Sequence, residues 1–211
     1  MFDVGETLID ESTEYGTWAD WIKIPRHTFS ATFGALIALG YDYRDVFRVF
    51  QPDFDLDTER DRRAAAGCPE TFGADDLYPD ARPVLQQLRD GGWWIGVAGN
   101  HTARAGEILH SLQLPADMIA TSASWGAAKP ASTFFDRLVT ATPYEPGEIC
   151  YVGDRLDWDI RPTHAAGLRT AWIRRGPWLN LRDDEAVAMA TFHLTSLRDL
   201  PRMLATFNAT H

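Results

Sequence analysis

Reactive polar side chains follow several apolar runs in this sequence. They are Asp3 near the start of the chain, then Asn100, Lys129 and Asp154, with Asp159 close behind the last. In an open parallel sheet, ligands bind outside the carboxyl ends of the strands, so side chains that follow different strands meet at one edge. Lysine is a compact point charge that suits a crowded anionic pocket. The spacing therefore predicts one pocket in which carboxylates gather around a lysine.

The scarcity of lysine singles out Lys129. The chain has 20 basic residues, and all but two of them are arginine. The only other lysine is Lys23. Any chemistry that requires a lysine therefore depends on one of these two side chains.

Parallel strands are needed to bring the reactive residues together, and the apolar pattern supplies them. Short apolar runs bounded by glycine are typical of buried strands, and helical segments alternate with them. We expect strands near 93–99, 118–121, 149–152, 170–173 and 192–194, and helices near 81–89, 102–112, 132–140, 159–167 and 197–204. This alternation predicts an α/β fold: a Rossmann-like, doubly wound parallel sheet with helices on both faces.

Residues 11–78 have a different, wholly helical texture. Phe29, Phe33 and Ile37 recur at the spacing of one apolar helix face. We expect this block to be an all-helical domain inserted into the α/β core. The core domain then comprises residues 1–10 and 79–211.

Two further expectations concern the inserted block. The tract 51–67 is rich in acidic residues and arginine, which is typical of a solvated surface of helix and loop. The candidates for the pocket wall are Trp158, outside the block, and within it Tyr15, Trp18, Trp21, Arg26 and His27. Core packing is the more frequent role of such aromatic residues.

Composition excludes several classes of partner. The chain has 30 acidic residues against 20 basic ones, a formal net charge of −10, and such a surface repels the phosphate backbone of nucleic acid. No apolar run reaches the ~20 residues of a membrane helix, and the start lacks a signal-peptide pattern. The cysteines, Cys68 and Cys150, form no C-x-x-C pair, which argues against a disulfide framework and a zinc site. We expect a cytoplasmic protein whose partner is a small molecule, and the composition leaves its oligomeric state open.

The order of the motifs resembles that of the haloacid dehalogenase-like (HAD) superfamily of hydrolases. The matching segments are Asp3-Val4-Gly5-Glu6-Thr7, Gly99-Asn100, Lys129-Pro130, and Gly153-Asp154 through Asp159. The inserted helical block lies between the first and second motifs, where this family places a helical C1-type cap. The resemblance covers nearly the whole chain and implies a hydrolase.

The resemblance also implies a chemistry. Asp3 would be the nucleophile and form an aspartyl-phosphate that water then hydrolyses. Asp154 and Asp159 would join Asp3 in holding Mg²⁺, which suits an all-oxygen site with crowded negative charge, and the backbone carbonyl of Gly5 is a further expected ligand. Lys129 would act as an electrostatic clamp. The implied activity is that of a Mg²⁺-dependent phosphatase for a small phosphorylated metabolite.

The chain departs from the family pattern at two positions. Gly5 stands where the family has the aspartate that protonates the leaving group, a role typically worth about 10² to 10⁴ in rate. Gly99 replaces the hydroxyl residue of the second motif, so the amide or the side chain of Asn100 is the expected phosphate contact. Thr7 is expected to support the loop around Asp3 and to belong, with Gly99 and Asn100, to the substrate-binding set. Glu6 is either an exposed loop residue or a replacement for the missing acid.

Other functions remain open on the sequence. Dehalogenases need no acid and no metal, but a carboxylate substrate would be repelled by Asp154 and Asp159. Phosphonatases use a lysine of the cap to form a Schiff base with the substrate, and Lys23 is the candidate for that role. A catalytically impaired binding protein that keeps the fold is the remaining alternative, and Gly5 and Gly99 favour it.

The first strand is short. Only Met1 and Phe2 precede Asp3, whereas a buried strand typically has ~5 residues. We therefore expect a natural start that is longer than the sequence given.

Overall fold

The fold is described from a computed structural model, which places residues 1–208. Its strands all pair in parallel, as the sequence predicts. On one side β1 (Gly96–Gly99) pairs with β2 (Met118–Thr121). On the other, β3 (Cys150–Gly153) pairs with β4 (Arg169–Ile173), which pairs with β5 (Phe192–Leu194).

The start of the chain joins these two sets of strands. Phe2 forms a parallel bridge with Val97 of β1 on one side and with Val152 of β3 on the other. The backbone N–H of Asp3 donates to the carbonyl of Val152 at 2.8 Å. Asp3 therefore lies at the middle of the carboxyl edge of the sheet, between β1 and β3.

Helices cover both faces of this sheet, and alternating strand residues point to opposite faces. Val97 and Val152 belong to a cluster with Leu85 of α5, whereas Tyr151 belongs to one with Phe134 of α8. The helices of the α/β part are α5 (Ala81–Asp90), α6 (Ala103–Ser111), α7 (Ser122–Trp125), α8 (Ser132–Thr140), α9 (Arg161–Ala165), α10 (Asp184–Met189) and α11 (Leu200–Asn208). The Rossmann-like α/β fold is thus confirmed.

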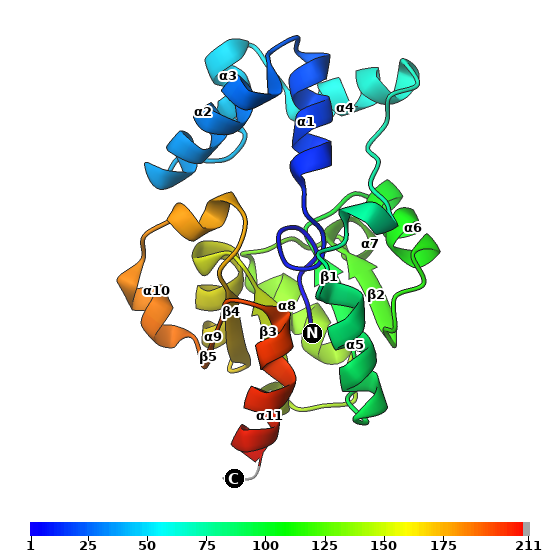
Figure 1. Cartoon of the computed structure of the whole chain (residues 1–211), viewed down its shortest axis with the longest axis vertical. Coiled ribbons are helices and arrows are strands. Elements are labelled where there is room, and N and C mark those ends of the chain that lie inside the picture. Colours follow the sequence, from blue (N-terminus) through cyan, green and yellow to red (C-terminus); the bar gives the residue numbers. More distant parts are fainter. Residues whose placement is uncertain (209–211) are drawn as a thin grey trace.

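Four helices near the start of the chain form a separate layer over the carboxyl edge of the sheet, at the top of Figure 1. They are α1 (Ser12–Trp21), α2 (Arg26–Ala38), α3 (Asp45–Phe50) and α4 (Leu56–Ala65). We call them the helical layer. Its own aromatic core contains Trp18, Phe29, Phe33 and Phe47, and Trp178 from the α/β part joins that core. Among the described residues, no helix has the length and apolar character to cross a membrane.

Short 3₁₀ and π segments complete the chain. They are η1 (Ala74–Asp76), η2 (Pro146–Glu148), the π-turn η3 (Leu156–Ile160), η4 (Pro177–Asn180) and η5 (Leu197–Asp199). The helix expected from Asp159 therefore begins earlier, as η3, and continues into α9. The expected solvated tract 51–67 has two exceptions, because Phe54 and Arg63 are both buried.

Candidate active site

Three aspartates meet at the carboxyl edge of the sheet. Asp3 follows the bridge at Phe2, Asp154 follows β3, and Asp159 lies in η3. All three are buried, and one carboxylate oxygen from each lies within 4.8 Å of the others. The structure therefore brings together the three carboxylates that the sequence singled out.

Lys129 lies between two of these carboxylates. Its ammonium Nζ is 2.7 Å from Asp3 Oδ1 and 2.6 Å from Asp159 Oδ1. Burial alone would lower the pKa of Lys129, but the charges and hydrogen bonds of Asp159 and Asp3 raise it overall. The side chain is thus a fixed cation beside Asp3.

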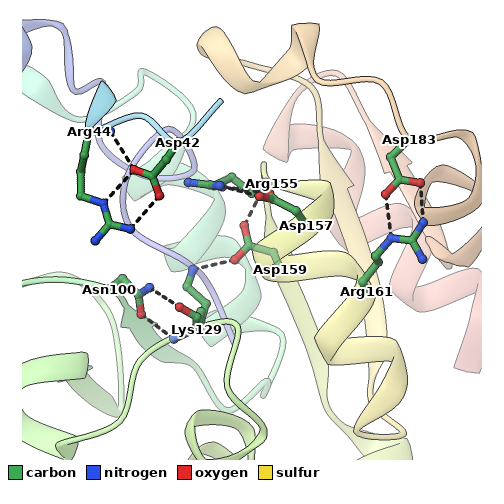
Figure 2. Close-up of polar contacts among 9 residues, drawn as sticks. All are labelled: Asp42, Arg44, Asn100, Lys129, Arg155, Asp157, Asp159, Arg161 and Asp183. Atoms are coloured by element: carbon green, nitrogen blue, oxygen red, sulfur yellow. Dashed lines mark hydrogen bonds and ion pairs between the residues drawn. The ribbon is translucent and has the colours of Figure 1, made fainter. Parts of the chain in front are cut away.

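The amide side chain of Asn100 holds the backbone of Lys129. Asn100 Nδ2 donates to the carbonyl of Lys129 at 2.8 Å, and the N–H of Lys129 donates to Asn100 Oδ1 at 2.8 Å (Figure 2). Asn100 lines the cavity described below. Either the side chain or the backbone amide of Asn100 was expected to contact a phosphate. The side chain positions Lys129 instead, so the backbone amide is the group that remains for a phosphate.

The carboxylates have the chemistry of a cation site. Asp154 Oδ2 is buried and has no hydrogen-bond partner among the described residues. Burial, followed by the charges of Asp159 and Asp3, raises the pKa of Asp154 well above its usual range. The pKa of Asp159 rises to about 6 through burial, although Lys129 opposes the rise. A hard divalent cation fits this all-oxygen donor set, and it would complete the coordination of the orphaned oxygen.

The two glycines of the site make room for neighbouring carboxylates. A Cβ placed on Gly99 would collide with Asp3 Oδ1, so a Ser or Thr there would require the Asp3 side chain to shift. A Cβ placed on Gly5 would lie 2.6 Å from Oε1 of Glu11. Burial, followed by the charges of Glu6 and Asp3, raises the pKa of Glu11 well above its usual value. Glu11 was not among the residues predicted for the site, and its only signal in the sequence is that it begins the expected helical block 11–78.

Glu6 is buried, so its expected place on an exposed loop is wrong. Its Oε2 accepts a hydrogen bond from the hydroxyl of Tyr78 at 2.5 Å, and its Oε1 accepts one from the backbone N–H of Glu11 at 3.3 Å. Burial raises the pKa of Glu6 to about 7, although the Tyr78 hydrogen bond opposes the rise. These hydrogen bonds hold the Glu6 side chain in place, and Glu6 does not line the cavity described below.

Thr7 lies in the turn that follows Asp3. It is fully buried, and its Oγ1 has no hydrogen-bond partner among the described residues. Its carbonyl accepts a hydrogen bond from Arg175 at 3.2 Å, and Arg175 also pairs with Asp80 at 2.7 Å. This placement suits the support of the loop, and Thr7 is not among the residues that line the cavity.

A cavity of about 490 Å³ separates the carboxylates from the helical layer. Its walls include the expected residues Tyr15, Trp18 and Trp158, and also side chains that the sequence did not indicate. The other expected wall residues, Trp21, Arg26 and His27, do not line it. The guanidinium of Arg155 lies 3.6 Å from the ring centroid of Trp158 and 3.8 Å from that of Trp178. Lys23 is exposed and does not line the cavity.

The sequence comparisons agree on one family of hydrolases. A family model described as haloacid dehalogenase-like hydrolase matches residues 1–167. The glyceraldehyde 3-phosphate phosphatase of Pyrococcus furiosus is 30% identical over 97% of this chain and 91% of its own length. That of Methanopyrus kandleri is 34% identical over 61% of this chain. The matched segments span only 58% of the M. kandleri protein and 54% of its Methanocaldococcus jannaschii counterpart.

Solved structures share the fold. A HAD phosphatase from Thermococcus onnurineus aligns with a TM-score of 0.59 at 24% identity, covering 96% of this chain and 95% of that one. The HAD-hydrolase YfnB from Bacillus subtilis, solved bound to magnesium, aligns with a TM-score of 0.68 at 19% identity, covering 96% of both chains. At this level of identity, these likenesses support the parallel sheet and its helices.

Proposed function

The chain belongs to the haloacid dehalogenase-like hydrolase family, and from this premise we propose that it is a phosphatase that acts on a small phosphorylated metabolite through an aspartyl-phosphate on Asp3. One observation carries the proposal: the buried Asp3 carboxylate lies 2.7 Å from the Lys129 ammonium, and both line a cavity of about 490 Å³. The substrates in the names of the relatives are small phosphorylated molecules, which agrees with this volume.

We further propose Mg²⁺ as the cofactor. Asp3, Asp154 and Asp159 would hold it, and the carbonyl of Gly5 would be a further ligand. When bound, such a cation neutralises charge between the carboxylates and a phosphate. The orphaned Asp154 Oδ2 supports this assignment.

Two steps make up the proposed reaction. A carboxylate oxygen of Asp3 attacks phosphorus, and the bond from phosphorus to the leaving oxygen breaks. Water then attacks phosphorus, and the bond between phosphorus and Asp3 breaks, which releases phosphate and restores the carboxylate. Throughout both steps the Lys129 ammonium offsets negative charge on Asp3 and the transferring group.

The helical layer supplies the roof of the cavity. We propose residues 11–78 as the cap domain and residues 1–10 with 79–211 as the core domain, because the layer has its own aromatic core. Tyr15, Trp18 and Tyr43 come from this layer and line the cavity opposite the carboxylates. The cap would therefore exclude water and select the substrate.

The alternative chemistries find less support. A haloacid carries a carboxylate. Without a compensating cation, the three buried carboxylates of the site would repel it. The only lysine available for a phosphonatase-type Schiff base is the exposed Lys23, away from the cavity wall.

The test is phosphate release with Mg²⁺ from acetyl phosphate, p-nitrophenyl phosphate and glyceraldehyde 3-phosphate. We expect turnover by the wild type, and a loss of at least about 10³-fold in Asp3→Asn, because an amide is not a nucleophile for phosphorus. Asp136→Asn, on the exposed face of α8, is the matched control and should behave as wild type. A wild type that releases no phosphate from any of these, or an Asp3→Asn variant of equal activity, would refute the proposal.

A further inference from the structure

We propose that Glu11 replaces the acid that the family has at position 5 and that this chain lacks. Glu11 would be the catalytic residue that protonates the leaving oxygen and later accepts a proton from the attacking water. This inference rests on the proposed phosphatase function. It would explain how the site can act on poor leaving groups although residue 5 is glycine.

The evidence is the place that the Glu11 carboxylate occupies. A Cβ built on Gly5 would lie 2.6 Å from Oε1, 2.7 Å from Cδ and 3.0 Å from Oε2 of Glu11. All three atoms of the Glu11 carboxylate group thus lie within 3.0 Å of the point at which a side chain of residue 5 would begin. The space beside Gly5 therefore holds a carboxylate that comes from position 11.

The local backbone explains why residue 11 returns to residue 5. Gly5 and Ile9 form a parallel bridge, and the N–H of Glu6 donates to the carbonyl of Ile9 at 2.7 Å. Glu6 Oε1 then accepts the backbone N–H of Glu11, while Tyr78 holds the other oxygen of Glu6. Glu6 is thus a positioning residue, and the tight loop fixes Glu11 directly before α1.

Glu11 also has access to the reaction. It lines the same cavity as Asp3 and Lys129, unlike Glu6. Two other glutamates of that cavity are bound elsewhere: Glu14 pairs with Arg63 at 2.9 Å, and Glu70 accepts a hydrogen bond from Thr102. Among the glutamates on the cavity wall, Glu11 is therefore the one placed at the missing side chain.

The proton balance closes over the two steps. As the bond from phosphorus to the leaving oxygen breaks, that oxygen takes the proton of the Glu11 carboxyl group, which becomes a carboxylate. When water attacks the phosphorus of the aspartyl-phosphate, the carboxylate takes one proton from that water. The bond to Asp3 then breaks, and Glu11 is protonated again for the next cycle.

The first experiment uses the full chain with Mg²⁺ and compares Glu11→Gln with wild type on two leaving groups. For glycerol 3-phosphate, whose alkoxide needs a proton, we expect kcat/KM to fall by about 10² to 10⁴. For p-nitrophenyl phosphate, whose phenolate leaves unaided, we expect a burst of one nitrophenolate per active site and then slow turnover, because only the second step needs the base. Glu107→Gln, an exposed glutamate of α6, is the matched control and should behave as wild type.

The second experiment moves the carboxylate back to position 5. Gly5→Asp alone should not raise activity, because its side chain would collide with Glu11. Glu11→Ala should lose activity towards glycerol 3-phosphate, and Gly5→Asp in that background should restore at least about 10-fold, because the space is then free. This rescue also separates lost chemistry from lost folding.

The outcomes separate the two hypotheses. A wild type that is inactive on every substrate overturns the proposed function and this role with it. An active wild type overturns the role of Glu11 alone under any of three results. These are a Glu11→Gln variant within 3-fold of wild type on glycerol 3-phosphate, an equal loss on both substrates without a burst, and a double variant that shows no rescue.

Discussion

At the level of single residues, Asp154 offers the sharpest test of the cation site. Its Oδ2 is buried without a partner among the described residues, and Asp3 and Asp159 lie close by. Asp154→Asn removes one of the three neighbouring negative charges, and it also removes a carboxylate ligand of the proposed cation. We expect the variant in EDTA to be at least as stable as wild type, because repulsion is relieved. Mg²⁺ should then raise the melting temperature of wild type only, with about 2.7 kcal/mol of stabilisation at 100 times the Kd.

Thermal melts with and without Mg²⁺ check this prediction. Asp136→Asn is again the control, and it should keep the full response to the cation. An Asp154→Asn variant whose melting temperature rises as much as that of wild type would place the cation elsewhere.

Glu6 should make stability depend on pH. Burial raises its pKa from the ordinary 4.5 to about 7. The folded state thus holds this proton more tightly than the unfolded chain, so its contribution to stability is greatest below pH 4.5 and falls as the pH rises towards 7. The total loss is roughly 3 kcal/mol. Glu6→Gln has no such proton, so its stability relative to wild type should increase between pH 5 and pH 8.

Urea unfolding of both proteins at pH 5 and pH 8, in EDTA, measures that difference. Buried acids that do not feel the charge of Glu6 titrate alike in wild type and variant, so their contributions cancel in the comparison. Glu11 is different, because the charge of Glu6 raises its pKa, and its altered titration is part of the difference. Equal changes with pH in the two proteins would show that Glu6 does not titrate in this range.

At the level of elements, Arg63 fastens α4 to α1. Its Nη1 lies 2.9 Å from Glu14 Oε1, its Nη2 donates to Thr17 Oγ1 at 2.8 Å, and its guanidinium lies 4.0 Å from the ring centroid of Trp18. Removing one partner of a buried pair leaves the other uncompensated, which typically costs 3–5 kcal/mol. We therefore expect Arg63→Met to lower the free energy of unfolding by about 3 kcal/mol.

The neighbouring arginine in the same helix is a matched control. Arg62 pairs with Glu59 but its side chain is 66% exposed, and exposed pairs contribute about 0–1 kcal/mol. Urea unfolding should therefore show a small effect for Arg62→Met and a large one for Arg63→Met. Similar losses in the two variants would mean that the contacts of Arg63 do not hold the layer together.

Element boundaries were predictable where the apolar pattern was local. The strand Met118–Thr121 and the helix Ser132–Thr140 agree with the prediction residue for residue. The strand expected from Trp93 begins only at Gly96, because the N–H of Trp93 donates to the carbonyl of Leu88 in the turn after α5. Apolar character alone does not separate such a turn from a strand.

The site was predictable in part for the same reason. Asp3, Lys129 and Asp154 follow apolar runs, and the parallel sheet brings such residues to one edge. Glu11 reaches the site through the loop bridge between Gly5 and Ile9, which leaves no periodic signal in the sequence. Tertiary contacts of this kind cannot be predicted from the apolar pattern of the sequence.

At the level of the whole molecule, aromatic contacts join the α/β part to the helical layer, and Trp178 makes two of them. Trp178, in η4 after β4, makes edge contacts with Phe33 and Tyr43 at centroid distances of 5.8 and 6.3 Å. Arg155 packs on the ring of Trp178 and pairs with Asp157 at 2.6 Å (Figure 2). Trp178, Tyr43 and Arg155 line the cavity, so contacts that close the layer onto the core also shape the proposed substrate site.

Replacing Trp178 should therefore affect substrate affinity and stability together. Trp178→Ala removes a buried ring, which typically costs 3–5 kcal/mol. It also removes one of the two rings on which Arg155 packs, and it opens the cavity wall. We expect KM for the best substrate to rise at least about 10-fold, with a smaller change in kcat, because Asp3 and Lys129 stay in place. Trp93→Ala, before the opposite end of β1, should lose stability but keep its KM. A Trp178→Ala variant with an unchanged KM would show that the aromatic contact serves folding alone, and substrate selection would then have to reside in α1 and α3.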